Sequence, residues 1–230
     1  MSTFADRVVL FFKELEYIGP LPQGISIMNP FRENPRIIPV ISQFYNKFYN
    51  DNRSRHLILG INPGRFGAGV TGISFTDTKR LADKCGLSIS GLETFETSSV
   101  FIYEMIDAFG GAEKFYSEFF ITSVSPLGFT AVNGNGKTIN YNYYDSKKLM
   151  EAVSGFIVES ILKQLEFGII RDICFCLGTG QNYKFILHLN SELKIFGEIV
   201  PLEHPRYIMQ YKSKQKQFYI DKYIGKFQSI

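Results

Sequence analysis

Short apolar runs, each ending in a loop of small polar residues, constrain the fold of this chain most strongly. The run Arg55–Ile61 (RHLILGI) is continuous, and it passes into a glycine-rich loop over residues 62–72. Further apolar runs cover residues 119–124, 170–177 and 197–202, with helical patterns between them. Continuous runs of this length are typical of parallel strands buried on both faces. The alternation predicts an α/β fold, a three-layer domain with a four-stranded, mainly parallel sheet and helices on both faces.

The residues before the first strand show two aromatic patterns of helical period. We expect helices over residues 4–15 and 37–49, joined by an ordered loop over 20–35, because the apolar side chains recur on one side of each segment. Length and a hydrophobic content of 45% favour a single domain over 1–230, with 1–50 as its N-terminal helical segment. Later helices are expected over residues 78–84, 99–109, 145–166, 180–188 and 213–227.

Composition excludes several classes of protein. No apolar run approaches the roughly 20 residues of a membrane span. The three cysteines, two of them in Cys174-Phe175-Cys176, argue against a disulfide framework and fit a reducing, cytoplasmic environment. Three are also too few for a four-cysteine iron–sulfur cluster. We expect a cytoplasmic monomer that binds no metal.

Positive charge is concentrated near the C-terminus. The chain carries a formal charge of +3, whereas residues 201–230 alone carry +4. A basic segment of this kind indicates contact with phosphates, although a solvated helix face would look the same. Within it, the pair Ile208-Met209 is flanked by Arg206 and Lys212. An exposed apolar pair would suit insertion into a stacked duplex, and the alternative is an anchor for the last helix.

Loops after parallel strands meet at one edge of a sheet, so four segments should surround a single crevice. They cover residues 62–75, 123–127, 178–182 and 204–212. Gly178-Thr179-Gly180 is only half of a dinucleotide fingerprint, and a tight strand-to-helix turn explains it better. The first segment lacks a Walker lysine, and by itself its Asn-Pro-Gly start would fit a simple turn.

The segment Gly60–Phe75 (GINPGRFGAGVTGISF) resembles motif one of the single-strand-selective monofunctional uracil-DNA glycosylases and matches it at nine of sixteen positions. Residues 119–127 (FFITSVSPL) and 202–212 (LEHPRYIMQYK) are similar to later motifs of that family, in the same order. The resemblance spans roughly residues 55–216. It implies a uracil-DNA glycosylase-like fold and a glycosylase of base excision repair that acts on single- or double-stranded DNA with a deaminated or oxidised base. It implies no cofactor.

The resemblance also implies roles for individual residues. Asn62 would orient the attacking water, and His204 would donate a hydrogen bond to the base oxygen that becomes anionic. The target base would be flipped out of the stack into a pocket. The residues implied to bind the base are Ile61, Phe66, Phe75 and Ser123, and those implied to bind DNA are Arg206, Tyr207, Ile208, Met209, Lys212 and Lys214.

Ser123 departs from the family, which has an asparagine at this position. A hydroxyl can donate or accept by rotating, so it distinguishes base edges less sharply than a fixed amide. Ala68 also replaces a larger methionine. Together they predict a base range wider than uracil, including hypoxanthine and xanthine, unless Phe75 or Tyr141–Tyr144 fills the space.

Two other functions compete with the glycosylase. A non-catalytic reader of damaged or single-stranded DNA would keep the basic segment and Phe75 but would have no use for Asn62. An enzyme acting on free nucleosides or nucleotides would not need Arg206 or Lys212. We favour the glycosylase because the motif around Asn62 and the histidine at residue 204 occur together.

Overall fold

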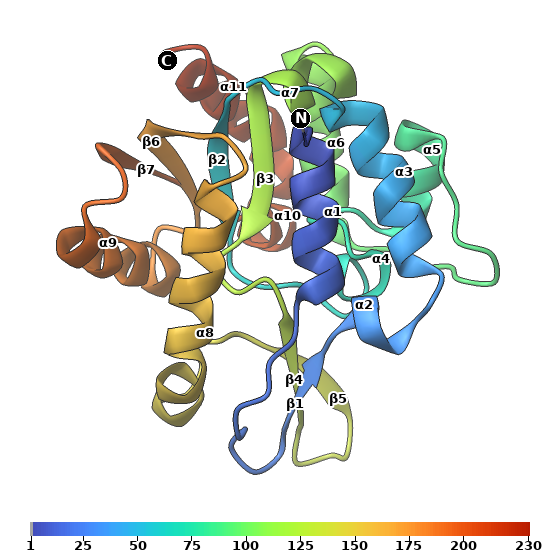
Figure 1. The fold of residues 1–230 in the computed structure, drawn as a ribbon, viewed down its shortest axis with the longest axis vertical. Helices are drawn as coiled ribbons and strands as arrows, with labels where there is room; N and C mark the ends of the chain where they lie inside the picture. The colour runs from blue at the N-terminus through green and yellow to red at the C-terminus, as the bar shows by residue number, and fades with distance from the viewer. Residues whose placement is uncertain (1) are drawn as a thin grey trace.

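Two β-sheets of unequal size organise the chain, as Figure 1 shows for residues 2–230, the part that this computed structural model describes. The larger sheet has the strand order β3-β2-β6-β7 and is parallel throughout. Its strands are β2 (Arg55–Gly60), β3 (Phe119–Ser123), β6 (Ile169–Leu177) and β7 (Glu198–Leu202). The predicted four-stranded parallel sheet is therefore confirmed.

The strands of the larger sheet are covered on both faces, which explains their continuous apolar sequences. Successive side chains of a strand point to opposite faces. In β3, the ring of Phe120 packs 5.3 Å from Phe4 on one face, while the ring of Phe119 packs 4.7 Å from Phe227 on the other. Each face thus has its own aromatic layer.

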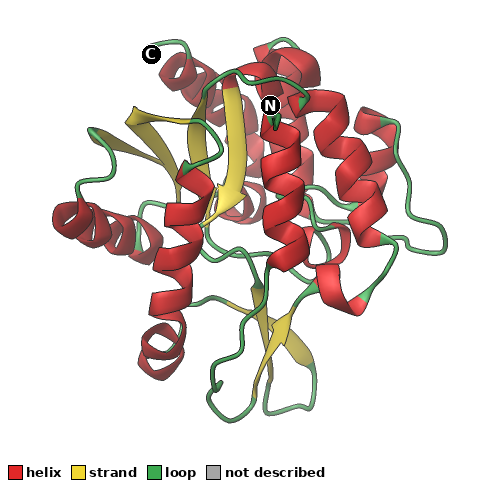
Figure 2. Ribbon diagram, viewed as in Figure 1, coloured by secondary structure: helices red, strands yellow, loops and turns green. Residues whose placement is uncertain are grey.

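Helices form the outer layers (Figure 2). In Figure 1, α1 (Phe4–Glu14) and α8 (Lys147–Leu165) lie in front of the large sheet, and α10 (Pro205–Tyr211) and α11 (Lys216–Phe227) lie behind it. None of the helices within residues 2–230 is long and apolar enough to cross a membrane. The remaining helical segments are α2 (Pro30–Glu33), α3 (Ile37–Tyr49), α4 (Ala68–Thr71), α5 (Thr78–Cys85), α6 (Thr97–Phe109), α7 (Ala112–Glu118), α9 (Gln181–Leu193) and the 3₁₀ turn Ser213–Gln215.

The smaller sheet was not predicted. It is antiparallel, has the order β1-β4-β5, and consists of β1 (Ile25–Met28), β4 (Gly128–Val132) and β5 (Thr138–Tyr141). Residues 20–35, expected as a loop, therefore contain a strand and a short helix. The strands of this sheet are short and partly exposed, and β1 pairs with residues distant in the chain, so local patterns do not reveal them. Figure 1 places this sheet beyond the ends to which the large-sheet strands point.

Helix α10 is a second difference from the prediction, which was a loop over residues 204–212. His204 is the N-cap of this helix, and Pro205 occupies its first position. Proline is favoured there because its missing N–H would have no partner and its φ angle is already helical.

Arg55 is a fully buried cation beside the sheet. Its guanidinium donates two hydrogen bonds to the carboxylate of Asp51, at 2.9 and 3.0 Å, and one to the carbonyl of Tyr116 at 2.7 Å. It also lies 4.7 Å from the ring centroid of Phe4 and 4.8 Å from that of Tyr49. The buried charge is compensated mainly by Asp51.

We predict that Asp51→Ala lowers the free energy of unfolding by about 3 kcal/mol, because it leaves the buried cation of Arg55 without its counter-ion. Urea denaturation measures this change. Asp83→Ala, at an exposed position of α5, should change the free energy by less than about 0.5 kcal/mol. Equal effects of the two variants would contradict the role assigned to the ion pair.

Candidate active site

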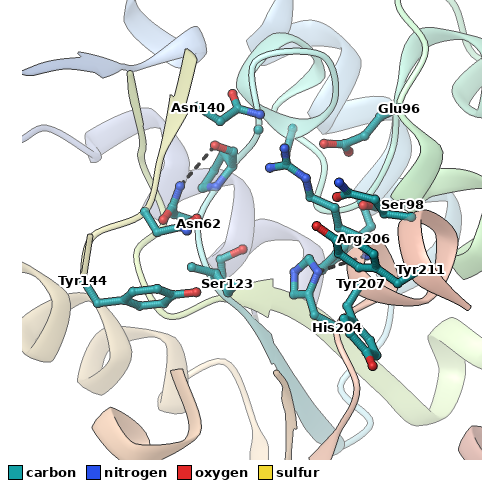
Figure 3. Close-up of a pocket in the computed structure, with 17 residues that line it drawn as sticks. Asn62, Glu96, Ser98, Ser123, Asn140, Tyr144, His204, Arg206, Tyr207 and Tyr211 are labelled. Carbon is teal, nitrogen blue, oxygen red and sulfur yellow. Dashed lines mark hydrogen bonds between the residues drawn. The ribbon is translucent and has the colours of Figure 1, made fainter. Parts of the chain in front are cut away.

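A cavity of about 270 Å³ lies beyond the carboxyl ends of β2 and β3. Figure 3 shows side chains from several elements converging on it. Ile61 and Asn62 follow β2, Ser123 ends β3, Phe75 lies just after the glycine-rich loop, and His204 caps α10. The structure thus brings together five residues from four separate segments of the chain.

The side-chain amide of Asn62 connects the two sheets. Its Nδ2 donates to the carbonyls of Tyr141, at 3.2 Å, and Pro63, at 3.4 Å. Its Oδ1 accepts the backbone N–H of Tyr143 at 3.1 Å. Both amide hydrogens are therefore directed at backbone carbonyls, and the second lone pair of Oδ1 is the capacity that remains for a ligand or water.

Asn182 stabilises the same corner; it ends the predicted segment 178–182, but the sequence assigned it no role. It is buried at the start of α9, where its Nδ2 donates to the carbonyls of Gly60, at 3.3 Å, and Leu177, at 3.2 Å. Its Oδ1 accepts the hydroxyl of Tyr143 at 2.8 Å. The turn at residues 178–180 therefore places a structural asparagine under the pocket, which agrees with the packing role preferred for that turn.

Phe75 has an uncommon backbone conformation at the wall of the pocket. Its φ angle is +52°, a region that bulky residues rarely adopt and that is frequent at functional sites. Its ring centroid lies 5.7 Å from that of His204, with 47° between the ring planes. A Cβ atom on Gly60 would come within 2.8 Å of the Phe75 ring, so this ring position requires glycine at residue 60.

Ser123 and its neighbour point in opposite directions. Ser123 pairs in register with Gly60 and lines the cavity. Thr122 faces the other side of the sheet, where its hydroxyl donates to the side-chain oxygen of Gln164 at 2.9 Å. Only the first of these two residues can therefore contact a ligand in the pocket.

His204 is held in one orientation and one charge state. Its Nδ1 accepts the backbone N–H of Arg206 at 3.1 Å, so in the neutral ring the proton resides on Nε2. Burial, followed by the nearby charge of Arg206, lowers the pKa of His204 to about 4. Near neutral pH the ring is an uncharged hydrogen-bond donor at the cavity wall.

Two expectations for site residues are wrong. Ile208 is fully buried, because it lies on the inner face of α10, and Met209 packs partly against the core. The expected exposed apolar pair therefore does not exist. Phe66 does not line the cavity either; this residue is 45% exposed, and its ring centroid lies 4.2 Å from the guanidinium carbon of Arg65.

The exposed face of α10 carries tyrosines instead. Tyr207 and Tyr211 are 43% and 66% exposed, both line the cavity, and their ring centroids are 5.6 Å apart. Tyr211 was not among the residues singled out in the sequence, because the helix that pairs it with Tyr207 was not predicted. Two aromatic rings therefore stand at the mouth of the pocket.

Positively charged side chains lie on the same surface, along α10 and the turn after it. Arg206 lines the cavity, Lys212 ends α10, and Lys214 is exposed in the next turn. Lys216, by contrast, forms an ion pair with Glu104, so part of the basic segment is already neutralised. Among the described residues, no carboxylate forms an ion pair with Arg206, Lys212 or Lys214, the three cations expected to bind DNA.

Three further residues line the cavity wall: Glu96 and Asn140, which no pattern in the sequence indicated, and Tyr144, which was expected only as a residue that could fill space. Burial, and next the charge of Asp77, raise the pKa of Glu96 to about 7. Figure 3 shows the Tyr144 hydroxyl directed into the cavity near Ser123. Within residues 2–230, no three His, Cys, Asp or Glu side chains are grouped so that they could hold a metal ion.

Comparison with known proteins agrees with the geometry. The family model described as the uracil DNA glycosylase superfamily matches residues 46–228. The chain is also similar to the crystal structure of wild-type Pedobacter heparinus SMUG2, with 60% sequence identity and a TM-score of 0.97. That match covers 100% of this chain and 98% of the other. No protein of curated function matches the chain.

We predict that His204 remains neutral, with its proton on Nε2, from pH 8 down to about pH 5. Since the unfolded histidine binds its proton near 6.5 and the folded one near 4, the unfolded chain binds more protons between these values. His204 therefore makes stability fall as the pH decreases from 6.5 to 4. Nitrogen NMR of the imidazole measures the protonation state, and a titration of His204 near pH 6.5 would contradict the prediction.

Proposed function

Because the chain belongs to the uracil DNA glycosylase superfamily, we propose that it is a monofunctional DNA glycosylase that hydrolyses the N-glycosidic bond of uracil and related deaminated bases. The observation that carries this proposal is the meeting of Asn62, Phe75, Ser123 and His204 in one cavity. A base must leave its stack to reach such a cavity, at a cost of a few kcal/mol. The cavity offers it an aromatic wall and polar groups at its edge.

Bond cleavage places positive charge on the sugar and negative charge on the departing base. The neutral His204 donates its Nε2–H to a base oxygen and stabilises the anion as it forms. Asn62 holds the attacking water through the free lone pair of its Oδ1. An amide is a weak base, but positioning suffices when the sugar carbon is already strongly electrophilic.

Water, rather than an amine of the protein, acts as the nucleophile in this proposal. No lysine is among the cavity-lining side chains of the described residues. Lys212, the nearest candidate along the chain, lies at the C-terminal end of α10. The product is therefore an abasic site in an intact strand.

DNA reaches the pocket across the exposed face of α10. We assign phosphate contacts to Arg206, Lys212 and Lys214, because these cations follow the cavity mouth. Tyr207 and Tyr211 are suited to stacking on unpaired bases, since aromatic rings accept any base on their faces. They take the place of the Ile208-Met209 pair that the sequence suggested.

We predict that the protein releases uracil, hypoxanthine and xanthine from oligonucleotides, single- or double-stranded, and that strands break only after alkali is added. Gel analysis with and without alkali measures this result. Strand breakage without alkali would indicate lyase chemistry and would contradict hydrolysis by water. No release of any of these bases would instead support a non-catalytic reader of DNA.

We predict that Asn62→Ala lowers the single-turnover excision rate by about 100-fold or more, because the water loses its positioning group, while DNA binding persists. Rates and Kd values are measured on the same oligonucleotide. Asn46→Ala, on the exposed side of α3, serves as the control and should leave both unchanged. An Asn62 variant with wild-type turnover would exclude this residue from catalysis.

We predict that Ser123→Asn shifts the preference toward uracil, because a longer, fixed amide narrows the cavity and reads the base edge more strictly. The ratio of uracil to hypoxanthine excision should rise roughly tenfold, within the 1–3 kcal/mol range of one bidentate base contact. Ser90→Asn, in an exposed loop, is the matched control. An unchanged ratio would mean that Ser123 does not contact the base.

A further inference from the structure

Glu96 is an acidic residue in the cavity wall, and it takes no part in the proposed reaction. It precedes α6, and its backbone N–H donates to the carboxylate of Asp77 at 2.6 Å. Asp77 in turn binds the guanidinium of Arg80 through two hydrogen bonds, at 2.8 and 2.6 Å. These contacts anchor the backbone of Glu96, so its side chain has a defined place in the cavity wall.

The carboxyl group of Glu96 lies against the loop that carries Asn62. A Cβ atom on Gly64 would come within 2.5 Å of one carboxyl oxygen, and a Cβ on Gly67 would be closer still to the other. On its other side, Figure 3 shows the carboxyl directed toward the guanidinium of Arg206. Glu96 therefore lies between the glycine-rich loop and the cation beside His204.

Glu96 is also poised to change charge near neutral pH. Burial, and next the charge of Asp77, raise its pKa to about 7, against the opposing effect of Arg206. The pKa of His204, about 4, lies well below this range. The charged or titratable side chains of the surrounding elements are Arg65 of the loop, Asp77 and Arg80 of α5, and His204, Arg206, Tyr207 and Tyr211 at α10.

We propose that Glu96 is a positioning residue that couples DNA binding to the uptake of a proton, because its carboxylate and a DNA phosphate compete for Arg206. This inference rests on the proposed function in one respect, namely that DNA enters beside Arg206. When Glu96 is ionised, an incoming phosphate meets a second negative charge. When Glu96 is protonated, this second negative charge is gone and the phosphate alone faces Arg206, while the neutral carboxyl remains packed against Gly64 and Gly67.

The direction of the pH dependence follows from this competition. A phosphate near Arg206 raises the pKa of Glu96 further, so the complex binds more protons than the free protein. Above about pH 7, Kd therefore rises with pH, by at most tenfold per unit for one linked proton. Below that pH, Glu96 is already protonated in the free protein, and Kd no longer depends on this group.

The test measures binding rather than excision. The probe is an oligonucleotide with a tetrahydrofuran abasic-site analogue, which has no base to lose, and Kd is determined by fluorescence anisotropy from pH 6 to 8.5 at constant ionic strength. The Kd of the wild-type protein should rise about tenfold above pH 7. Glu96→Gln should remove this rise and bind about tenfold more tightly than wild type at pH 8.5. Glu93→Gln, an exposed residue of the same loop with the same charge change, should keep the wild-type slope.

A purely supporting role of Glu96 for the loop would give a different result, in which Glu96→Gln weakens binding equally at every pH. That result would overturn the inference. So would an identical dependence of Kd on pH in the wild-type protein and Glu96→Gln, or the absence of DNA binding. If Glu96→Gln does not fold, the number of protons taken up on DNA binding is measured on the wild-type protein instead. Isothermal titration calorimetry at pH 8 in two buffers of different ionisation enthalpy gives this number. Uptake of about one proton supports the inference, and uptake of none overturns it. Proton-linked binding without base excision would refute the proposed function and leave this inference standing.

Discussion

The side-chain amide of Asn62 is the interaction on which the site depends. It joins the segment that follows β2 to the last residue of β5 and to Tyr143 just beyond it, so it connects the large and the small sheet at the pocket. The same amide supplies the free lone pair that the proposed chemistry uses. Structural and chemical roles are thus combined in one group, and the buried Asn182 below it keeps that corner rigid.

The other polar groups of the pocket are likewise set by backbone contacts before any ligand arrives. A backbone N–H of α10 fixes the tautomer of His204, and burial keeps its ring neutral. Such a pre-oriented donor needs no reorganisation when negative charge develops on a leaving base. Strain at Phe75 and the absence of a side chain at Gly60 allow the aromatic wall to stand close to this donor.

The sequence predicted the parts of the fold that follow from local patterns. The apolar run at Arg55–Ile61 indicated the central strand, and the order of the strands brought Asn62, Ser123 and His204 together. The sequence did not reveal the small sheet, because its strands are short and β1 pairs with residues distant in the chain. For this reason Tyr144, which follows β5, was expected only as a residue that could fill space. The burial of Ile208 depends on helix α10, which was not predicted. The position of Glu96 in the cavity wall depends on tertiary packing, which a local sequence pattern does not encode.

In the proposed reaction, the cavity lined by Phe75 and His204 receives a base that has been flipped out of the DNA. A crystal structure of the wild-type protein with a duplex containing a 2′-fluoro-2′-deoxyuridine tests this claim most directly, because the electron-withdrawing fluorine disfavours positive charge on the sugar and keeps the bond intact. We predict that the base stacks on the ring of Phe75, with its edge toward Ser123, one of its oxygens accepting the Nε2–H of His204, and the sugar carbon facing Asn62. A base that remains stacked in the bound duplex, with the cavity empty, would contradict it.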